Sequence, residues 1–507
     1  MTDQLDLDVL IVGGGPTGAS LGLLLGRAGV RTQIIDKEAE IYPLPRAAHI
    51  DHEVARIFQE MGLAEEQSKT WRVAPRYDFL TKKGDILLRF DHMDRIGPGG
   101  WPVANMIHQP ILEAGLRDAI ADQDNVELVT RACYLSHREC GDHVEVEIET
   151  PSGIVTRTTR YLVGADGAKS PVREAAGIAF DDLNFDEPWL VVDVLVLDRS
   201  RLPDINLQIC DPERPTTCVL MGEGRHRWEF MIKPDETPEK VLDDAFIADL
   251  LAPWNVEGAI EIERKAVYRF NAKVAEQWRK GRVLLVGDAA HQMPPFAGQG
   301  LCSGLRDAAN LAWKLTAIND AATDTLLDTY QLEREPNVRA IISMAMMMGQ
   351  TVCITDPAAA AQRDAAMIAA RASGTSPDGS TAYPAIDNGC IMSRTPAAGT
   401  YFPQPVASSS QDLKLDDVLG AGACLISRSS PETYESSSTS VRIASLDSAE
   451  LAPFRDQLDH WLAAHAADAV LVRPDRYVFG TGAPSAVVKA WATKLDLLPV
   501  DTSASHS

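Results

Sequence analysis

Residues 8–30 read DVLIVGGGPTGASLGLLLGRAGV, and this stretch decides the fold. The apolar run Val9–Val12 predicts a buried parallel strand, which passes directly into a glycine-rich turn and a helix. Three glycines follow the G-x-G-x-x-G pattern, which permits a tight turn, close approach of a pyrophosphate and packing of helix on strand. The amides at the helix N-terminus then face the negative charge. The predicted binding residues are Gly13, Gly15, Pro16, Thr17 and Gly18.

A second strand completes the pattern of a dinucleotide site. It is predicted for Thr32–Ile35 and ends at Asp36, whose carboxylate can accept hydrogen bonds from both hydroxyls of an adenosine ribose. We include the adjacent Lys37 in the same predicted site. A signal peptide or a membrane span would also be nearly free of charge, but the glycines, the proline and the acidic second strand argue against both.

Composition narrows the class of protein further. The chain has 507 residues, enough for two or three domains, and its 45% hydrophobic and 24% charged content is that of an ordinary soluble protein. A net charge of −24 without a basic stripe argues against nucleic acid and against an anionic membrane surface as partners. Eight cysteines without a C-x-x-C pair indicate reduced thiols, so we expect a cytoplasmic protein.

Two later segments predict further contacts with the same cofactor. Tyr161–Arg173 reads YLVGADGAKSPVR, a strand that breaks at a turn where Asp166 can organise the loop. Arg282–His291 reads RVLLVGDAAH, a buried strand that ends at the acid Asp288. The loop at 298–301 then offers bare amides at the start of a helix, and such amides suit a ring edge that gains negative charge on reduction. A hydride-accepting ring fits that description.

In this order the motifs G-x-G-x-x-G, G-A-D-G-x-x-S-x-V-R and R-V-x-L-x-G-D-A-A-H-x-x-P-P-x-x-G-Q-G resemble those of the group A flavoprotein monooxygenases, the single-component aromatic hydroxylases. The resemblance covers roughly residues 5–345. Within this superfamily, Pro45–Glu53, Ile107–Pro110 and Leu327–Glu335 are most similar to the 3-(3-hydroxyphenyl)propionate hydroxylases and to relatives acting on substituted phenols and polyketides.

The resemblance implies non-covalent FAD as cofactor and NADH or NADPH as co-substrate. It implies that Arg46 and Gln109 contact the pyrophosphate and ribityl regions, and that Asp288 binds there too. Asp166 would serve both FAD and the nicotinamide cofactor, and Pro295 would lie beside the flavin ring. The amides toward the pyrimidine edge of the ring would come from Gly298, Gly300 and Leu301. From the residues alone, the arginine also fits a solvated loop and the glutamine a helix cap.

The expected fold is α/β: a glutathione-reductase-like Rossmann FAD domain, an inserted β-sheet substrate domain and a C-terminal thioredoxin-like domain. Alternation in 189–197, 216–221 and 227–232 predicts strands of a sheet covered on one side. The C-terminal domain has no C-x-x-C, and its Arg473–Tyr477 run is expected to be structural. The predicted boundaries are 1–75, 101–180 and 275–350 for the FAD domain, 76–100 and 181–274 for the substrate domain, 351–412 for a helical linker and 413–507 for the last domain.

The resemblance also implies the reaction. A phenolic substrate would be hydroxylated ortho or para to its hydroxyl with NAD(P)H and O₂, through a flavin C4a-hydroperoxide, by a homodimeric enzyme. Electrophilic attack needs a phenolate, so a side chain that accepts the substrate proton is expected. Arg225 or Arg227 is a candidate partner for a substrate carboxylate. The catalytic candidates are His49, Tyr77 and His226, with Pro295 as the residue beside the ring.

Other functions stay open at this point. The chain fits a polyketide-tailoring hydroxylase of the same family, or an FAD oxidase or dehydrogenase that does not hydroxylate. A flavin-dependent halogenase would share the FAD fold, but the expected W-x-W-x-I-P segment is absent from the sequence. A non-enzymatic flavoprotein that acts through its C-terminal domain is the alternative from another class. Stimulation of NAD(P)H oxidation by a phenol, with product analysis, separates these functions.

Overall fold

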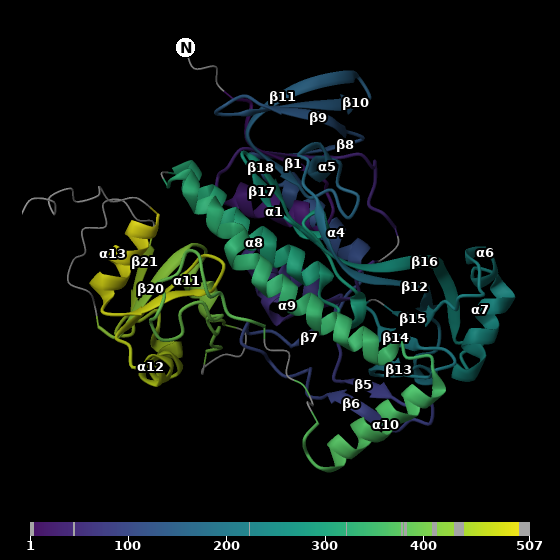
Figure 1. The fold of residues 1–507 in the computed structure, drawn as a ribbon. Coiled ribbons are helices and arrows are strands. Elements are labelled where there is room, and N and C mark those ends of the chain that lie inside the picture. Colours follow the sequence, from purple (N-terminus) through teal and green to yellow (C-terminus); the bar gives the residue numbers. More distant parts are fainter. Residues whose placement is uncertain are drawn as a thin grey trace, which may run out of the picture.

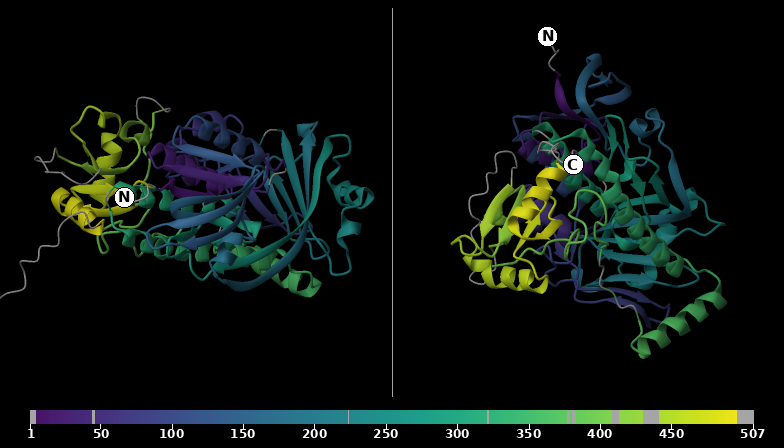
Figure 2. Two further views of the ribbon diagram at one scale, coloured as in Figure 1. Left: turned by 90° about the horizontal axis from the view of Figure 1, so that it is seen from above. Right: turned by 60° about the vertical axis from the view of Figure 1, so that its left-hand side comes forward.

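The computed structural model describes residues 5–43, 46–222, 224–320, 322–376, 379, 383–407, 413–429 and 441–495. These residues form three parts, which Figures 1 and 2 show from different sides. In the left view of Figure 2 the N-terminal α/β part lies in the middle, a second sheet lies at one end and the C-terminal part lies at the other.

The first part is built on a sheet whose central strands are parallel. Its strands are β1 (Leu7–Val12), β2 (Thr32–Asp36), β8 (Val126–Thr130), β9 (Cys133–Glu139), β10 (Val144–Thr150), β11 (Gly153–Gly164), β17 (Arg279–Lys280) and β18 (Val283–Leu285). The order is β17-β18-β11-β1-β2-β8, and β9 and β10 extend β11 as antiparallel strands. Because β1, β2, β11 and β18 run parallel, their carboxyl ends meet at one edge, where ligands bind in sheets of this kind.

Glycines let the first helix lie close to this sheet. The helices of this part include α1 (Pro16–Arg27), α4 (Gln109–Ala121), α5 (Pro171–Ala175) and α8 (Gly300–Asp320). A Cβ atom at Gly22 of α1 would lie 2.4 Å from Ile34 Cδ1, and one at Gly26 would lie 2.3 Å from Val126 Cγ2. The helix axis therefore sits nearer to the strands than any side chain at these positions would allow.

The second part is a mostly antiparallel sheet with the order β19-β16-β12-β15-β14-β13-β5-β6. Its strands are β5 (Tyr77–Leu80), β6 (Ile86–Phe90), β12 (Phe180–Val196), β13 (Asn206–Ile209), β14 (Thr216–Leu220), β15 (Arg225–Met231), β16 (Ile260–Ala275) and β19 (His291–Gln292). A small sheet consists of β3 (His49–Asp51), β7 (Ala104–Met106) and β4 (Arg72–Val73), in that order. Helices α2 (His52–Glu60) and α3 (Ala64–Ser68) follow β3 in the sequence.

Both faces of the second sheet are covered, so the prediction of a sheet covered on one side is wrong. On the outer face, Val192 and Trp228 pack into an apolar core with Ile247 of α7 (Asp244–Leu251), beside α6 (Pro238–Val241). On the inner face, the ring of Trp189 lies 5.6 Å from that of Phe296 in the loop before α8. The outer helices were missed because they are short.

Two long helices follow α8 along the chain. They are α9 (Asp328–Val352) and α10 (Pro357–Ala372). Among the described residues no single helix is long and apolar enough to cross a membrane; one pair, Asp324–Val352 with Pro357–Ala372, passes that test of length and composition only when taken together, with a bend of 116° between its members.

The C-terminal part has a four-stranded sheet with the order β21-β20-β22-β23. Its elements are α11 (Leu415–Leu419), β20 (Ala423–Ser427), β21 (Val441–Ser445), α12 (Arg455–Ala464), β22 (Ala469–Val472), β23 (Val478–Gly482) and α13 (Pro484–Lys494). The first two strands are parallel, and the third is antiparallel to both the first and the fourth. This order and these directions are those of a thioredoxin-like sheet, and Cys424 is buried inside it.

A buried ionic network joins this part to helices α8 and α9. Arg473 donates to Glu333 of α9 at 2.7 Å and to Asp475 at 2.6 Å, while Lys314 of α8 lies 2.9 Å from Glu333. Asn310 donates to both carboxylates. Although burial raises the pKa of Glu333, Arg473 and Lys314 lower it well below its usual range. The Arg473–Tyr477 run thus has the contacts of a structural motif.

Removing one partner from this network is expected to be costly. Arg473→Ala leaves Glu333 and Asp475 buried without their main counter-ion, and breaking a buried pair in this way costs about 3–5 kcal/mol. We expect a lower apparent melting temperature and faster proteolysis of the C-terminal part. The matched control is Arg442→Ala, whose pair with Glu450 is exposed and contributes roughly 0–1 kcal/mol. Equal melting curves for the two variants would contradict the structural role of the network.

Candidate functional site

The glycine-rich turn of β1 and the turn after β11 touch through their backbones. Gly13 has a φ of 108°, and a Cβ atom there would lie 2.4 Å from the carbonyl oxygen of Ala165 and 3.0 Å from Asp166 Cα. A Cβ atom at Gly18 would lie 2.0 Å from the oxygen of Gly13. Side chains at these positions would push the two turns apart, so the structure accounts for both glycines sterically.

The third motif packs against the same helix. A Cβ atom at Gly304 of α8 would lie 2.6 Å from Thr17 Oγ1, and one at Gly287 would lie 3.0 Å from the same atom. Thr17 is thus enclosed by two glycines of the third motif. The three sequence motifs, which are far apart in the chain, meet at the start of α1 beside the carboxyl ends of the parallel strands.

The N-terminus of α1 has the features of an anion-binding site. Gly15 is its N-cap, no side chain caps the helix, and no heavy atom of the described chain lies within 4 Å of a Cβ atom built at Gly15. The first amides of a helix have no partner within the helix and carry its positive dipole. The space and the amides together fit a pyrophosphate.

Asp36 is fixed at the end of β2 by backbone amides. Its Oδ2 accepts a hydrogen bond from Gly14 at 2.9 Å, and its Oδ1 accepts one from Glu38 at 2.8 Å. Each carboxylate oxygen can accept a second bond, so this geometry leaves room for ribose hydroxyls. The neighbouring Lys37 is exposed.

Asp288 lies in a 3₁₀ turn, Gly287–Ala289, and not at the end of a buried strand as the sequence suggested. Strand β18 already ends at Leu285, and Asp288 is accessible to solvent although protein surrounds it. Burial by the surrounding protein raises its pKa, which His291 and Arg46 partly offset.

Gln109 holds the loop that carries Arg46. Its Oε1 accepts hydrogen bonds from the backbone amides of Arg46 at 3.1 Å and Ala47 at 2.8 Å, and its Nε2 donates to Glu113 at 2.7 Å. The amide of Gln109 therefore orders this loop, and the guanidinium of Arg46 is exposed. Direct contact of either residue with the cofactor stays a prediction.

Asp166 and the loop 295–301 lie on the two sides of this region. Asp166 accepts a hydrogen bond from the Val172 amide with Oδ2, whereas its buried Oδ1 has no partner. Pro295 lies in a 3₁₀ turn that ends at Gly298, whose φ is 63°. Helix α8 begins directly afterwards, at Gly300.

His49 lies against this loop and has an unusual environment. Its Nδ1 donates to the carbonyl oxygen of Gly298 at 3.2 Å, because a carbonyl can only accept, and this fixes the tautomer. Its Nε2 is therefore an acceptor, and it is buried with no partner. Burial lowers the pKa of His49 below 6.5, although Asp51 opposes the shift, so the imidazole is neutral at pH 7.

The other two predicted proton acceptors, His226 and Tyr77, have different surroundings from those of His49. His226 shares the outer face of the sheet with Trp228, its Nε2 lies 3.0 Å from Cys218 Sγ, and burial lowers its pKa to about 3. Tyr77 donates to Gln208 at 3.2 Å, and burial raises its pKa far above 10. His226 thus lies on the face away from the FAD-binding part, and Tyr77 is placed to donate a hydrogen bond.

The inner face of the second sheet carries charged residues that the sequence analysis did not single out. Asp193 pairs with Arg227 at 2.6 Å and with Arg264 at 3.4 Å, and Glu229 lies 3.6 Å from Arg227. Arg227 also donates to the carbonyl oxygen of Arg46 at 2.9 Å, which places this face against the FAD-binding part. An acid inside the apolar run WLVVDVLV was the signal in the sequence.

Both arginines that were predicted to bind a substrate carboxylate already contact a protein carboxylate. Arg225 donates to Glu263 at 2.8 Å, and Arg227 is held by Asp193. His291, which follows the Gly-Asp motif, also contacts a protein carboxylate. Its Nε2 lies 2.6 Å from Asp307, which forms an ion pair with Arg334 at 2.8 Å. These contacts indicate that His291 has a structural role.

Comparison with known proteins agrees with this geometry. A family model described as "FAD binding domain" matches residues 6–345, and one described as "HcaD C-terminal domain" matches 399–496, beginning before the predicted boundary at 413. A "Probable NADH-specific resorcinol 4-hydroxylase" of Rhodococcus jostii is 37% identical over 96% of this chain and 94% of its own. A "3-(3-hydroxy-phenyl)propionate/3-hydroxycinnamic acid hydroxylase" of Mycolicibacterium gilvum is 36% identical over 84% of this chain and 76% of its own.

Solved structures show the same fold at low identity. The flavin-dependent monooxygenase PieE, in complex with FAD and substrate, is 21% identical, with a TM-score of 0.81 over 98% of this chain and 100% of that chain. Aklavinone-11 hydroxylase, with FAD and aklavinone, is 24% identical, with a TM-score of 0.75 over 98% and 100%. Together with the family models, which cover most of the sequence, these matches show that the chain belongs to the FAD-dependent aromatic hydroxylases, as its motifs predicted.

Proposed function

We propose that this enzyme hydroxylates a small uncharged phenol, of the resorcinol class, with NADH and O₂, and that His49 accepts the phenolic proton. One observation carries the proposal: the buried Nε2 of His49 has no partner and is fixed as an acceptor beside the loop that precedes α8. The name of the Rhodococcus jostii relative supports both the substrate class and the reductant.

Charges on the inner sheet face support an uncharged substrate. Arg227 and Arg264 are matched there by Asp193 and Glu229, so the face is close to neutral overall. A substrate carboxylate would have to compete with protein carboxylates for these arginines, at the cost of leaving a charge buried without its partner. A phenol bearing a second hydroxyl needs only hydrogen bonds. Burial raises the pKa of Glu229, although Arg227 opposes this shift. The Glu229 carboxyl group can form a hydrogen bond with a hydroxyl of the substrate.

The proposed role of His49 follows from elementary proton transfer. A neutral imidazole accepts the phenolic proton on Nε2, and the resulting phenolate donates electron density to its ortho and para carbons. The hydrogen bond from Nδ1 to Gly298 persists in both charge states and stabilises the imidazolium. FAD, when bound, supplies the reduction of O₂ and the transfer of one oxygen atom. The rings of Trp189 and Phe270 pack against Phe296 of the loop before α8, where this apolar cluster would help to keep water from the reacting ring.

His49→Gln is expected to reduce kcat/KM about 100-fold at pH 7, because the proton acceptor is lost. The loss should shrink as the pH approaches the pKa of a phenol, about 10, where the substrate ionises by itself. In the wild-type enzyme the pKa of His49 lies below 6.5, so activity should fall only below that pH, where Nε2 becomes protonated. Initial rates against pH measure both effects.

The matched control for this experiment is His226→Gln. Both histidines are buried, but His226 contacts Cys218 and Trp228 on the outer sheet face. We expect a pH profile of unchanged shape, with thermal melting used to check that both variants fold. A His49→Gln enzyme with a wild-type pH profile would remove His49 from the reaction.

The residues proposed to hold FAD are those that line the meeting point of the three motifs. The α1 amides would bind the pyrophosphate and Asp36 the adenosine ribose. Asp288 and Arg46 would contact the pyrophosphate and ribityl regions, and the amides of 298–301 would face the ring. The unpartnered Oδ1 of Asp166 supports its predicted place in the same site. Each of these groups has capacity for a further hydrogen bond.

Asp288→Ala is expected to weaken FAD binding about 10- to 150-fold, because a hydrogen bond to a charged group contributes about 1.5–3 kcal/mol. Equilibrium dialysis of the flavin measures this directly, without turnover. Asp198→Ala, an acid that caps a short 3₁₀ helix of the second sheet, is the control and should bind FAD normally. Unchanged FAD affinity in the Asp288 variant would exclude the proposed contact.

Isotope labelling tests the reaction class. With resorcinol and NADH the product should gain one oxygen atom from ¹⁸O₂, ortho or para to a hydroxyl, and NADH oxidation should accelerate. A 3-hydroxyphenylpropionate is the comparison substrate, and the balanced charges on the sheet face predict a lower kcat/KM for it. Label from water, or consumption of NADH without hydroxylated product, would favour the dehydrogenase or oxidase alternative.

The remaining expectations are part of the same proposal. We infer a cytoplasmic enzyme, because all eight cysteines are free thiols and NADH is an intracellular reductant. The homodimer stays a prediction, and sedimentation equilibrium measures it.

A further inference from the structure

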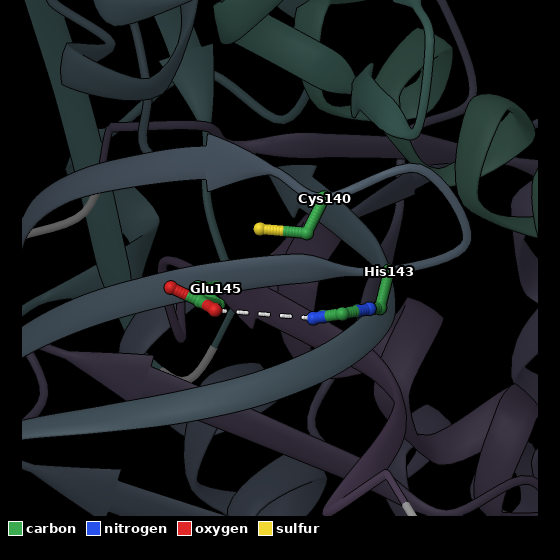
Figure 3. A group of neighbouring side chains, drawn as sticks. All are labelled: Cys140, His143 and Glu145. Atoms are coloured by element: carbon green, nitrogen blue, oxygen red, sulfur yellow. Dashed lines mark ion pairs between the residues drawn. The ribbon is translucent and has the colours of Figure 1, made fainter. Parts of the chain in front are cut away.

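The β9–β10 hairpin brings together a thiol, an imidazole and a carboxylate. Cys140, His143 and Glu145 lie around its turn, and one ligand atom from each lies within 4.8 Å of the others. Figure 3 shows the side chains of Glu145 and His143 facing each other with the Cys140 sulfur beside them. We propose that these three residues bind a zinc-class divalent ion, with the fourth ligand position open to solvent.

The three donor types suit this class of metal. A thiolate, an imidazole nitrogen and a carboxylate oxygen are the ligands that Zn²⁺ takes from proteins, whereas Mg²⁺ and Ca²⁺ prefer oxygen alone. His143 Nε2 lies 4.0 Å from Glu145 Oε1, so an inward movement of well under 1 Å per atom gives the spacing of tetrahedral ligands at about 2.0–2.3 Å from the metal. Partly exposed side chains can make this movement.

Partners outside the three residues orient two of the donors. His143 Nδ1 lies 2.8 Å from Asp142 Oδ1, a carboxylate–histidine contact that leaves Nε2 free to point at the cluster. Arg138 donates to Glu145 Oε2 at 2.6 Å, which leaves Oε1 toward His143. The thiol of Cys140 lies 3.7 Å from the carbonyl of Arg138 and also hydrogen-bonds the Glu145 carboxylate inside the cluster. Each ligand thus presents a usable atom to the same point.

The backbone of the turn is also held from outside. Cys140 donates its amide to the carbonyl of His143 at 2.8 Å, which closes the hairpin. Arg282, at the start of the third motif, donates from Nε to the Gly141 carbonyl at 3.0 Å and from its amide to Glu139 at 2.9 Å. The backbone that carries the ligands is therefore ordered before a metal binds, which lowers the entropy lost on binding.

Binding is accompanied by loss of a proton. The Cys140 thiol becomes a thiolate bonded to the metal, its proton goes to the buffer, and no electron is transferred. The ionised Glu145 binds without proton loss, because hydrogen bonding by Arg138 lowers the pKa of this carboxyl. Affinity should therefore decrease as the pH falls, because protons compete for the thiolate and the imidazole.

Cobalt(II) titration of the tag-free, reduced holoenzyme tests the proposal. Tetrahedral cobalt bound to a thiolate gives d–d bands at longer wavelengths than the flavin absorbs, so the cofactor can remain in place. We expect these bands to saturate at one ion per chain and Zn²⁺ to displace the cobalt. They should vanish in Cys140→Ser and His143→Ala, while Cys133→Ser, a partly exposed cysteine on the same hairpin, should titrate like the wild type.

Asp142→Asn tests the orienting contact separately. Loss of such a partner typically weakens metal binding 10- to 100-fold without removing a ligand, so the same bands should form at higher cobalt concentration. Absence of thiolate–cobalt bands in the wild-type protein would overturn the proposal. So would bands that persist in Cys140→Ser.

Discussion

The site depends on one steric constraint, the contact between backbones at the start of α1. The turn after β1 lies against the turn after β11 at Gly13, and Thr17 fits between Gly287 and Gly304 of the third motif. Only glycine permits these approaches, since added Cβ atoms would lie 2.0–2.6 Å from backbone or side-chain oxygens at Gly13, Gly18 and Gly304. The bare amides of the helix and of the loop before α8 are thereby brought to one place. A larger residue at any of these contacts would separate the groups expected to hold the two ends of one cofactor.

Helix α8 transmits this arrangement to the rest of the molecule. It begins directly after the loop 295–299, and its Arg306 pairs with Glu53 and with Asp51, which lies in the same short strand as His49. Further along, Lys314 enters the ionic network with Glu333 that anchors the C-terminal part. A single rigid element therefore positions the loop, the proposed base and the third domain. The lack of a C-x-x-C in that domain is consistent with a purely structural contribution from its buried arginine.

The sequence predicted what depends on local pattern and missed what depends on pairing across the fold. The glycine motifs, the parallel strands and the family could be predicted because each is written in consecutive residues. The prediction that Asp288 ends a buried strand was wrong, because strand β18 ends at Leu285 and a 3₁₀ turn follows. The periodicity of the sequence does not resolve a difference of a few residues. His226 and Arg227 are adjacent in sequence yet lie on opposite faces of the sheet, and only the register of β15 assigns the faces. Asp193 was missed because its partners, Arg227 and Arg264, come from two other strands.

The inner face of the second sheet links substrate recognition to cofactor recognition. Arg227 is held by Asp193 within the sheet, and the same guanidinium donates to the backbone of Arg46 in the loop that Gln109 orders. A substrate that disturbs the Asp193–Arg227 pair would therefore also disturb the loop expected to lie along the flavin. Because buried pairs are costly to break, the pair favours ligands that leave it intact. The side chain of Arg227 thus affects both which substrates the inner face accepts and how well the loop that carries Arg46 is ordered.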